Sequence, residues 1–165
     1  MVYRMDIVVF YDDCFAKKFK NMSTTRIKAV MAIVEEMFSE YDSLETTIQF
    51  KDDFPIVPKF QSNWCDKNWE DIIKPSGELG MIADGTTFPA HAYIFLTHGS
   101  QNEYNLGRAH KGQACNPNKS YRISINQYKS NSWMNGDLGT AGVICEHIIQ
   151  YKSVIALSDK ARNRL

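Results

Sequence analysis

Side chains suited to metal binding and acid–base chemistry gather in one predicted helix near the end of the chain, over residues 139–157. Apolar residues recur there at steps of three and four, the spacing of one buried helical face. Two side chains four residues apart on a helix can reach the same metal ion. Glu146 and Gln150 have this spacing, and His147 lies between them. The apolar face consists of Ile144, Ile148, Tyr151 and Ile155.

This helix aligns with the zinc-protease motif His-Glu-x-x-His-x-x-Gly-x-x-His, but it lacks the metal ligands of that motif. Glu146, Gln150 and Ala156 occupy the three histidine positions. His147 occupies the position of the glutamate that acts as general base. A glutamate oxygen can bind zinc, whereas glutamine is a poor ligand and alanine is none. Ser153 replaces the glycine that lets the chain turn toward the third histidine. The sequence therefore predicts no intact metal site and no intact catalytic residue.

The remaining histidines do not predict a replacement metal site. His91, His98 and His110 are far apart in sequence and fall in predicted strand or loop segments. A lone histidine is more often a structural residue than a ligand. We therefore expect no metal cofactor.

The composition is that of one globular domain. The chain has 165 residues, of which 44% are hydrophobic and 12% aromatic, enough to bury a sizeable core. Its 19 basic and 19 acidic residues balance, so we expect neither nucleic acid nor an anionic membrane as a partner. No apolar run approaches the roughly 20 residues that span a bilayer.

The cysteines and the start of the chain leave the cellular compartment open. No pair forms a Cys-x-x-Cys site, so a cysteine-rich zinc site is not expected; disulfides and free thiols both remain open, with three full pairings. The start of the chain has no signal peptide, which fits either an intracellular protein or a domain cut from a precursor. Asn21 and Asn118 lie in glycosylation sequons. The cysteines are Cys14, Cys65, Cys115 and Cys145.

Hydrophobic patterns along the chain predict a mixed α/β sheet packed by helices. Asp12 and Asp13 are expected to form a turn, Ser23 to cap the long helix, and Pro55 and Pro58 to interrupt regular structure. Strands are predicted at residues 6–11, 46–51, 91–97 and 121–126, a short edge strand within 106–115, and helices at 14–20, 23–41, 64–73 and 139–157.

Five phrases in this order resemble the catalytic domain of the adamalysin, or reprolysin (M12B-type), branch of the metzincin zinc endopeptidases. Arthropod venom and salivary members are the most similar in character. The resemblance covers residues 1–157, and residues 158–165 are expected to form a solvated tail. The phrases are Met5-Asp-Ile-Val-Val-Phe-Tyr-Asp, the long helix of residues 26–41, His91-Ala-Tyr-Ile-Phe-Leu-Thr, Leu106-Gly-Arg-Ala-His-Lys-Gly-Gln-Ala-Cys, and Thr140-Ala-Gly-Val-Ile-Cys-Glu-His.

The resemblance implies the upper subdomain of a metzincin. This subdomain is a twisted, mostly parallel sheet with an antiparallel edge strand, packed by a long helix and by the former zinc helix. It also implies secretion, and it implies that the lower subdomain, with the usual partner of Cys115, is missing. In the family, substrates pair with the edge strand by β-augmentation. The residues at that strand here are Gly107, Arg108, Ala109 and His110.

These observations favour an inactive, metalloprotease-like domain that binds a protein or peptide. An active zinc endopeptidase with misaligned ligands is the alternative, and zinc would be its cofactor. Two further readings are a truncated or spliced product and an unrelated α/β domain. The sequence does not identify the substrate, the partner or the oligomeric state.

Overall fold

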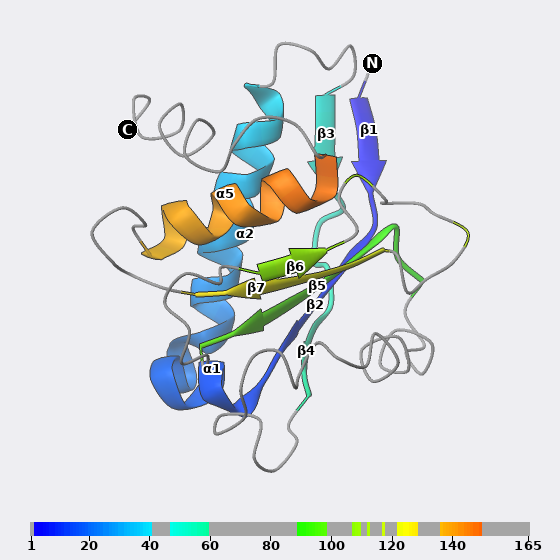
Figure 1. The fold of residues 1–165 in the computed structure, drawn as a ribbon. Helices are drawn as coiled ribbons and strands as arrows, with labels where there is room; N and C mark the ends of the chain where they lie inside the picture. The colour runs from blue at the N-terminus through cyan, green and yellow to red at the C-terminus, as the bar shows by residue number, and fades with distance from the viewer. Residues whose placement is uncertain are drawn as a thin grey trace.

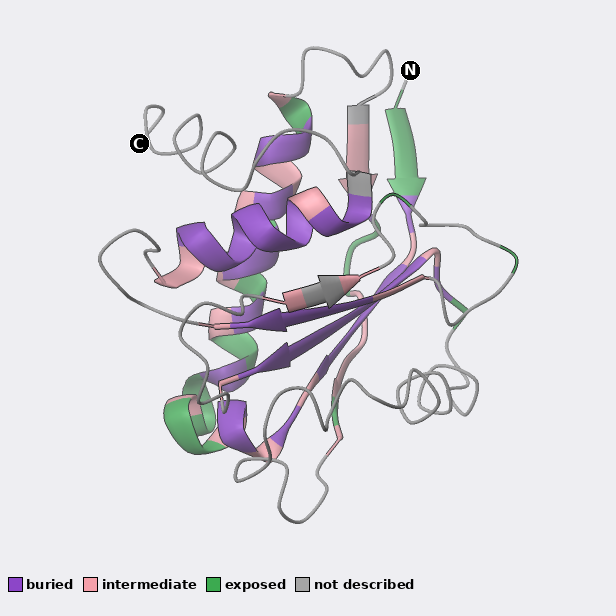
Figure 2. Ribbon diagram, viewed as in Figure 1, coloured by how far each residue is buried: buried purple, intermediate pink, exposed green. Residues whose placement is uncertain are grey.

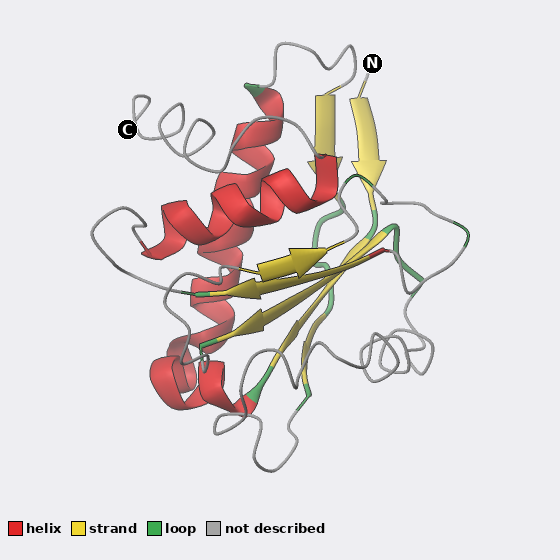
Figure 3. Ribbon diagram, in the orientation of Figure 1, coloured by secondary structure: helices red, strands yellow, loops and turns green. Residues whose placement is uncertain are grey.

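The computed structural model describes residues 2–40, 47–59, 89–98, 107–109, 112, 117, 122–128 and 136–149. The helix expected at residues 64–73 and the tail expected at 158–165 lie outside these ranges. Within them, the chain forms two sheets and a layer of helices (Figures 1 and 3). The expected mixed α/β architecture is confirmed.

The main sheet has five strands in the order β4-β2-β5-β7-β6. Strands β4, β2, β5 and β7 run parallel to one another, and β6 runs antiparallel to β7. Figure 1 shows that β6 lies at the edge of this sheet, beside helix α5. The strands are β2 (Ile7–Tyr11), β4 (Ile56–Pro58), β5 (Ala92–Thr97), β6 (Gly107–Ala109) and β7 (Ile123–Gln127).

The helices pack on one face of the sheet. Side chains from α2 and α5 share one core cluster with alternate residues of β2 and β5, including Ile7, Val9 and Ile94. The intervening residues of the same strands, such as Val8 and Phe95, form a second cluster on the other face. Residues on both faces of the main sheet are therefore buried, which explains why the sequences of β2 and β5 are continuously apolar (Figure 2). The helices are α1 (Asp13–Phe19), the 3₁₀ helix η1 (Lys20–Met22), α2 (Ser23–Ser39) and α5 (Gly136–Ile149).

The strand predicted at residues 46–51 is confirmed, and the structure adds where it pairs. The strand expected at residues 46–51 exists as β3 (Thr47–Phe50), but it pairs with β1 (Val2–Met5) in a separate two-stranded sheet. In the main sheet β2 pairs with β5 and with β4, which ends at Pro58, a residue that was expected to interrupt regular structure. A proline is tolerated there because β4 is an edge strand and loses no ladder hydrogen bond on its free side.

Two predicted helix starts also need correction. Ser23 does not cap α2, because η1 runs directly into the helix; the Ser23 hydroxyl instead donates to Lys20 O at 2.7 Å. Helix α5 begins at Gly136, three residues before the predicted start. Gly136 has a φ of +35°, and a Cβ there would lie 2.7 Å from the Tyr128 hydroxyl oxygen. Glycine therefore fits this first turn.

The start of α5 is tied to α2 and to the end of β7. The Arg26 guanidinium donates to Asp137 Oδ2 at 2.6 Å, and the Tyr128 hydroxyl donates to Asp137 Oδ1 at 2.7 Å. Burial, together with this hydrogen bond, raises the pKa of Tyr128, so the hydroxyl stays protonated and keeps donating. The aspartate also lies in the first turn of α5, where the helix dipole favours a negative charge.

Asp12 and Asp13, which were expected to form a turn, begin helix α1. Asp12 is the N-cap of α1, where Oδ1 accepts from Phe15 N at 2.9 Å and Oδ2 accepts from the Thr97 hydroxyl. The Asp12 carboxyl is completely buried. Burial raises its pKa from 3.8 to about 6, although both hydrogen bonds act in the opposite direction. Its ionised form is therefore disfavoured in the folded protein.

We expect an Asp12→Asn variant to become more stable relative to the wild type as the pH rises. The folded-state pKa lies above the unfolded value, so the stabilising contribution of the carboxyl is present below pH 3.8 and is lost as the pH rises through about 6. The difference in unfolding free energy should change by about 3 kcal/mol across that window. Urea denaturation of both proteins from acid to neutral pH measures it, and a constant difference would contradict the assignment.

Candidate functional site

Helix α5 lies over β7 and β6, with its second half next to the edge strand (Figure 1). Its predicted apolar face is confirmed for Ile144 and Ile148, which are buried in the core cluster shared with α2. Tyr151 and Ile155 lie outside the described residues. Helix α5 is thus anchored in the core, and its His147 reaches the edge of the sheet.

His147 points into the protein and is 7% exposed. Its Nδ1 lies 2.9 Å from the Ser124 hydroxyl of β7. Asn126, also on β7, directs its Nδ2 toward the carbonyl oxygens of Ser124 (3.1 Å) and Phe95 (3.4 Å), and toward Ser124 Oγ (2.9 Å). Carbonyl oxygens only accept, so the amide nitrogen donates to this group of oxygens. The Ser124 hydroxyl can then donate to His147 Nδ1.

The edge strand fits closely against this histidine. A Cβ on Gly107 would lie 2.7 Å from His147 Cε1 and 2.3 Å from the Ile125 carbonyl oxygen. Beyond β6, Gly112 N donates to the His147 carbonyl oxygen at 2.9 Å. His147 therefore contacts the edge segment with its ring and with its backbone.

The predicted general-base position is thus occupied by a buried structural side chain. Glu146, the first predicted ligand position, is half-buried on α5, while Gln150 and Ala156 lie outside the described residues. The neighbouring Cys145 is a buried free thiol. Burial, together with the charge of Glu146, raises its pKa to about 12, so the thiolate that binds metals is disfavoured. The donors described here do not fit a zinc ion.

The other histidines of the described chain are separated from this site. His91 Nδ1 accepts from Asp6 N at 2.9 Å near the start of β5. His98 packs against the Phe19 and Tyr128 rings, with centroids 6.2 and 6.3 Å away. His110 lies outside the described residues. No shared histidine site is formed by those the structure describes.

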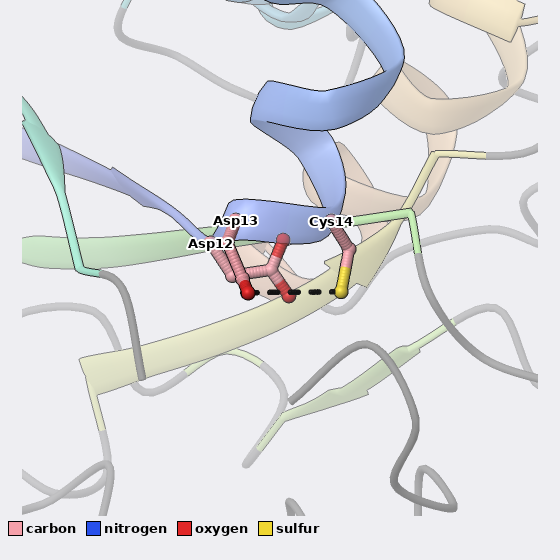
Figure 4. Close-up of side chains that lie close together, drawn as sticks. All are labelled: Asp12, Asp13 and Cys14. Atoms are coloured by element: carbon pink, nitrogen blue, oxygen red, sulfur yellow. Dashed lines mark hydrogen bonds between the residues drawn. The ribbon is translucent and has the colours of Figure 1, made fainter. Parts of the chain in front are cut away.

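One cluster of potential metal ligands occurs in the described residues, but its Asp12 and Cys14 side chains are already engaged in other bonds. Asp12, Asp13 and Cys14 place one ligand atom each within 4.8 Å of one another (Figure 4). Cys14 is disulfide-bonded, so its sulfur carries no proton and no thiolate charge. The 3.8 Å approach of this sulfur to Asp13 is therefore a packing contact. Both Asp12 oxygens already accept hydrogen bonds.

The remaining predicted sites are described in part. Gly107 and Ala109 are half-exposed on β6, whereas the side chain of Arg108 lies outside the described atoms. Asn21 is exposed in η1, and Asn118 lies outside the described residues, as do Cys65 and Cys115. Glycosylation at either asparagine remains a prediction.

Sequence reasoning missed Ser124, Asn126 and the packing role of Gly107. Alternation alone does not tell whether the polar residues of this strand face solvent or a buried partner. A strand within a mostly parallel sheet is covered on both faces, however, so such polar residues need buried partners. The need of Ser124 for a buried partner is the signal that could have pointed to His147 on the helix that covers the strand.

We expect Gly107→Ala to destabilise the protein by about 1–3 kcal/mol, because one of its two clashes is with a backbone oxygen that cannot rotate away. Chemical denaturation measures this loss. The double variant with His147→Ala removes the contact with the ring and leaves the contact with Ile125 O. It should therefore not recover the stability of the His147→Ala protein. A Gly107→Ala protein as stable as the wild type would contradict this packing.

Comparisons with known proteins support the fold alone. No protein-family model matches the chain, and no curated protein matches it. Among the solved structures that match is a chain described as "Structure of a chaperone-substrate complex", with a TM-score of 0.57 and 11% sequence identity. The match covers 88% of this chain and 23% of that chain, so this chain spans less than a quarter of the solved one. Among the described residues, no helix is long and apolar enough to cross a membrane.

Proposed function

We propose that this chain is a catalytically inactive, reprolysin-like module that binds an extended segment of another protein along β6. The observation that carries the proposal is the placement of an antiparallel edge strand beside a helix whose only described histidine is engaged in packing. The proposal extends to an extracellular location, as in the family it resembles.

The edge strand offers backbone groups for pairing. On one side β6 pairs with β7, and within the described part of the chain no strand pairs with its other side. An edge strand presents unpaired N–H and C=O groups to that side. A peptide in an extended conformation can add to such an edge by main-chain hydrogen bonds. Gly107 and Ala109 are both partly exposed on this strand.

The arrangement of strands supports the reprolysin-like part of the proposal. The resemblance implied a mostly parallel sheet, an antiparallel edge strand within residues 106–115, and packing by a long helix and the former zinc helix. The structure has these features in the corresponding segments. Many α/β proteins share such general features, so the family assignment rests mainly on the five sequence phrases.

The chemistry of α5 supports an inactive protein. Zinc peptidases need three protein ligands and a carboxylate that polarises the bound water. Here the position of that carboxylate holds His147, whose Nδ1 is engaged by Ser124. Glu146 is the one predicted ligand position with a strong zinc-binding side chain. We therefore assign binding, and no hydrolytic step, to this site.

The test is selection of binders from a random peptide library, followed by measurement of their dissociation constants. We expect Ala109→Lys to weaken the selected peptides at least about tenfold, because a lysine on an edge strand opposes pairing with a further strand. Val2→Lys is the matched control, since Val2 is 56% exposed on β1 and its replacement should leave binding unchanged.

Two results would contradict the proposal. Equal loss of binding in both lysine variants would mean that β6 is not the binding edge. Cleavage of the selected peptides that stops on addition of a chelator would show an active metallopeptidase.

A further inference from the structure

We infer that His147 and Ser124 are positioning residues for the proposed binding edge: they hold β6 and Gly112 in the conformation that a peptide would meet. The significance for binding rests on the function proposed above. The positioning itself rests only on contacts within the chain.

The need for such support follows from the size of the strand. β6 has three residues and, among the described strands, pairs with β7 alone. A short edge strand has few hydrogen bonds and is prone to local opening. A binding edge that opens must be ordered again when a peptide binds, and this ordering reduces affinity. Contacts that keep β6 ordered therefore favour binding.

His147 of α5 makes one contact before Ala109 in sequence and one after it. Before it, the His147 ring lies against Gly107, close enough that even a methyl group there would collide with it. After it, the His147 backbone carbonyl accepts from Gly112 N at 2.9 Å. One residue of α5 thus contacts both Gly107 and Gly112.

The hydrogen bond to Ser124 fixes the ring that makes the first of these contacts. His147, Ser124 and Asn126 are 7%, 3% and 0% exposed, so their polar groups must be satisfied within the protein. The 2.9 Å approach of Ser124 Oγ to Nδ1 sets the orientation of the imidazole. An apolar replacement of His147 would remove this orientation and leave the Ser124 hydroxyl with Asn126, to whose Oδ1 it can donate over a longer distance of 3.2 Å.

Hydrogen–deuterium exchange of the purified full chain tests the inference. In His147→Leu, which keeps the bulk of the ring without its polar atoms, we expect the amides of residues 107–109 and 112 to exchange about tenfold faster, the effect of losing a buried hydrogen bond. His147→Asn should restore most of the protection, because its side-chain oxygen can occupy the position of Nδ1. Ser124→Ala should resemble His147→Leu.

Ile144→Val is the control, because Ile144 lies in the core cluster shared with α2 and makes no contact assigned to β6. It should lower the global stability without selectively increasing exchange at β6. Exchange that rises throughout the protein in His147→Leu, or a His147→Asn protein that behaves like His147→Leu, would overturn the inference.

The peptides selected on the wild type separate this inference from the proposed function. Selective exchange at β6 together with weaker peptide binding in His147→Leu supports both. Selective exchange without any peptide binding to the wild type supports the positioning role and refutes the proposed function. Unchanged exchange at β6, with wild-type peptide binding intact, refutes the positioning role alone.

Discussion

The buried hydrogen bond between His147 and Ser124 joins α5 to the sheet at a point where the sheet carries polar side chains. A mostly parallel sheet is covered on both faces, so a polar side chain on an inner strand must find its partner inside the protein. Ser124 and Asn126 partly satisfy each other, and His147 supplies the contact from the helix. Together with the burial of Ile144 and Ile148 in the core, this interaction is consistent with one rotation of α5 about its own axis. In that rotation the imidazole lies close against Gly107.

The beginning of α5 is held by a different set of polar contacts. Asp137 joins Arg26 of α2 and Tyr128 at the end of β7. At the same carboxyl-terminal edge of the sheet, Asp12 joins the start of α1 to Thr97 of β5. Helix α5 is thus attached at its start to α2 and β7, and near its end to β7 and the edge segment. Attachment at two distant points limits its movement over β6.

The sequence was sufficient for the features that depend on local hydrophobic spacing. It predicted the long helix, the strands at β2, β5 and β7, and the short edge strand, because each carries its own periodicity. It failed where a residue's role is set by a distant partner. Pro58 was expected to interrupt regular structure, but it is accepted in β4 because that strand lies at an edge, and the pairing of β3 with β1 in a separate sheet was not predicted. His147 was identified as the general-base position of a motif, but its contact with Ser124 could not be read from spacing.

In the function proposed here, α5 supports a binding edge and holds no metal. The zinc content of the purified, dialysed and cooperatively folded protein, measured by elemental analysis, tests this claim most directly. We predict far less than one zinc ion per chain, since the described donors on α5 do not form a ligand set. Zinc close to one ion per chain would contradict this prediction, because the chain would then hold a set of zinc ligands that the described arrangement, with His147 bonded to Ser124, does not contain.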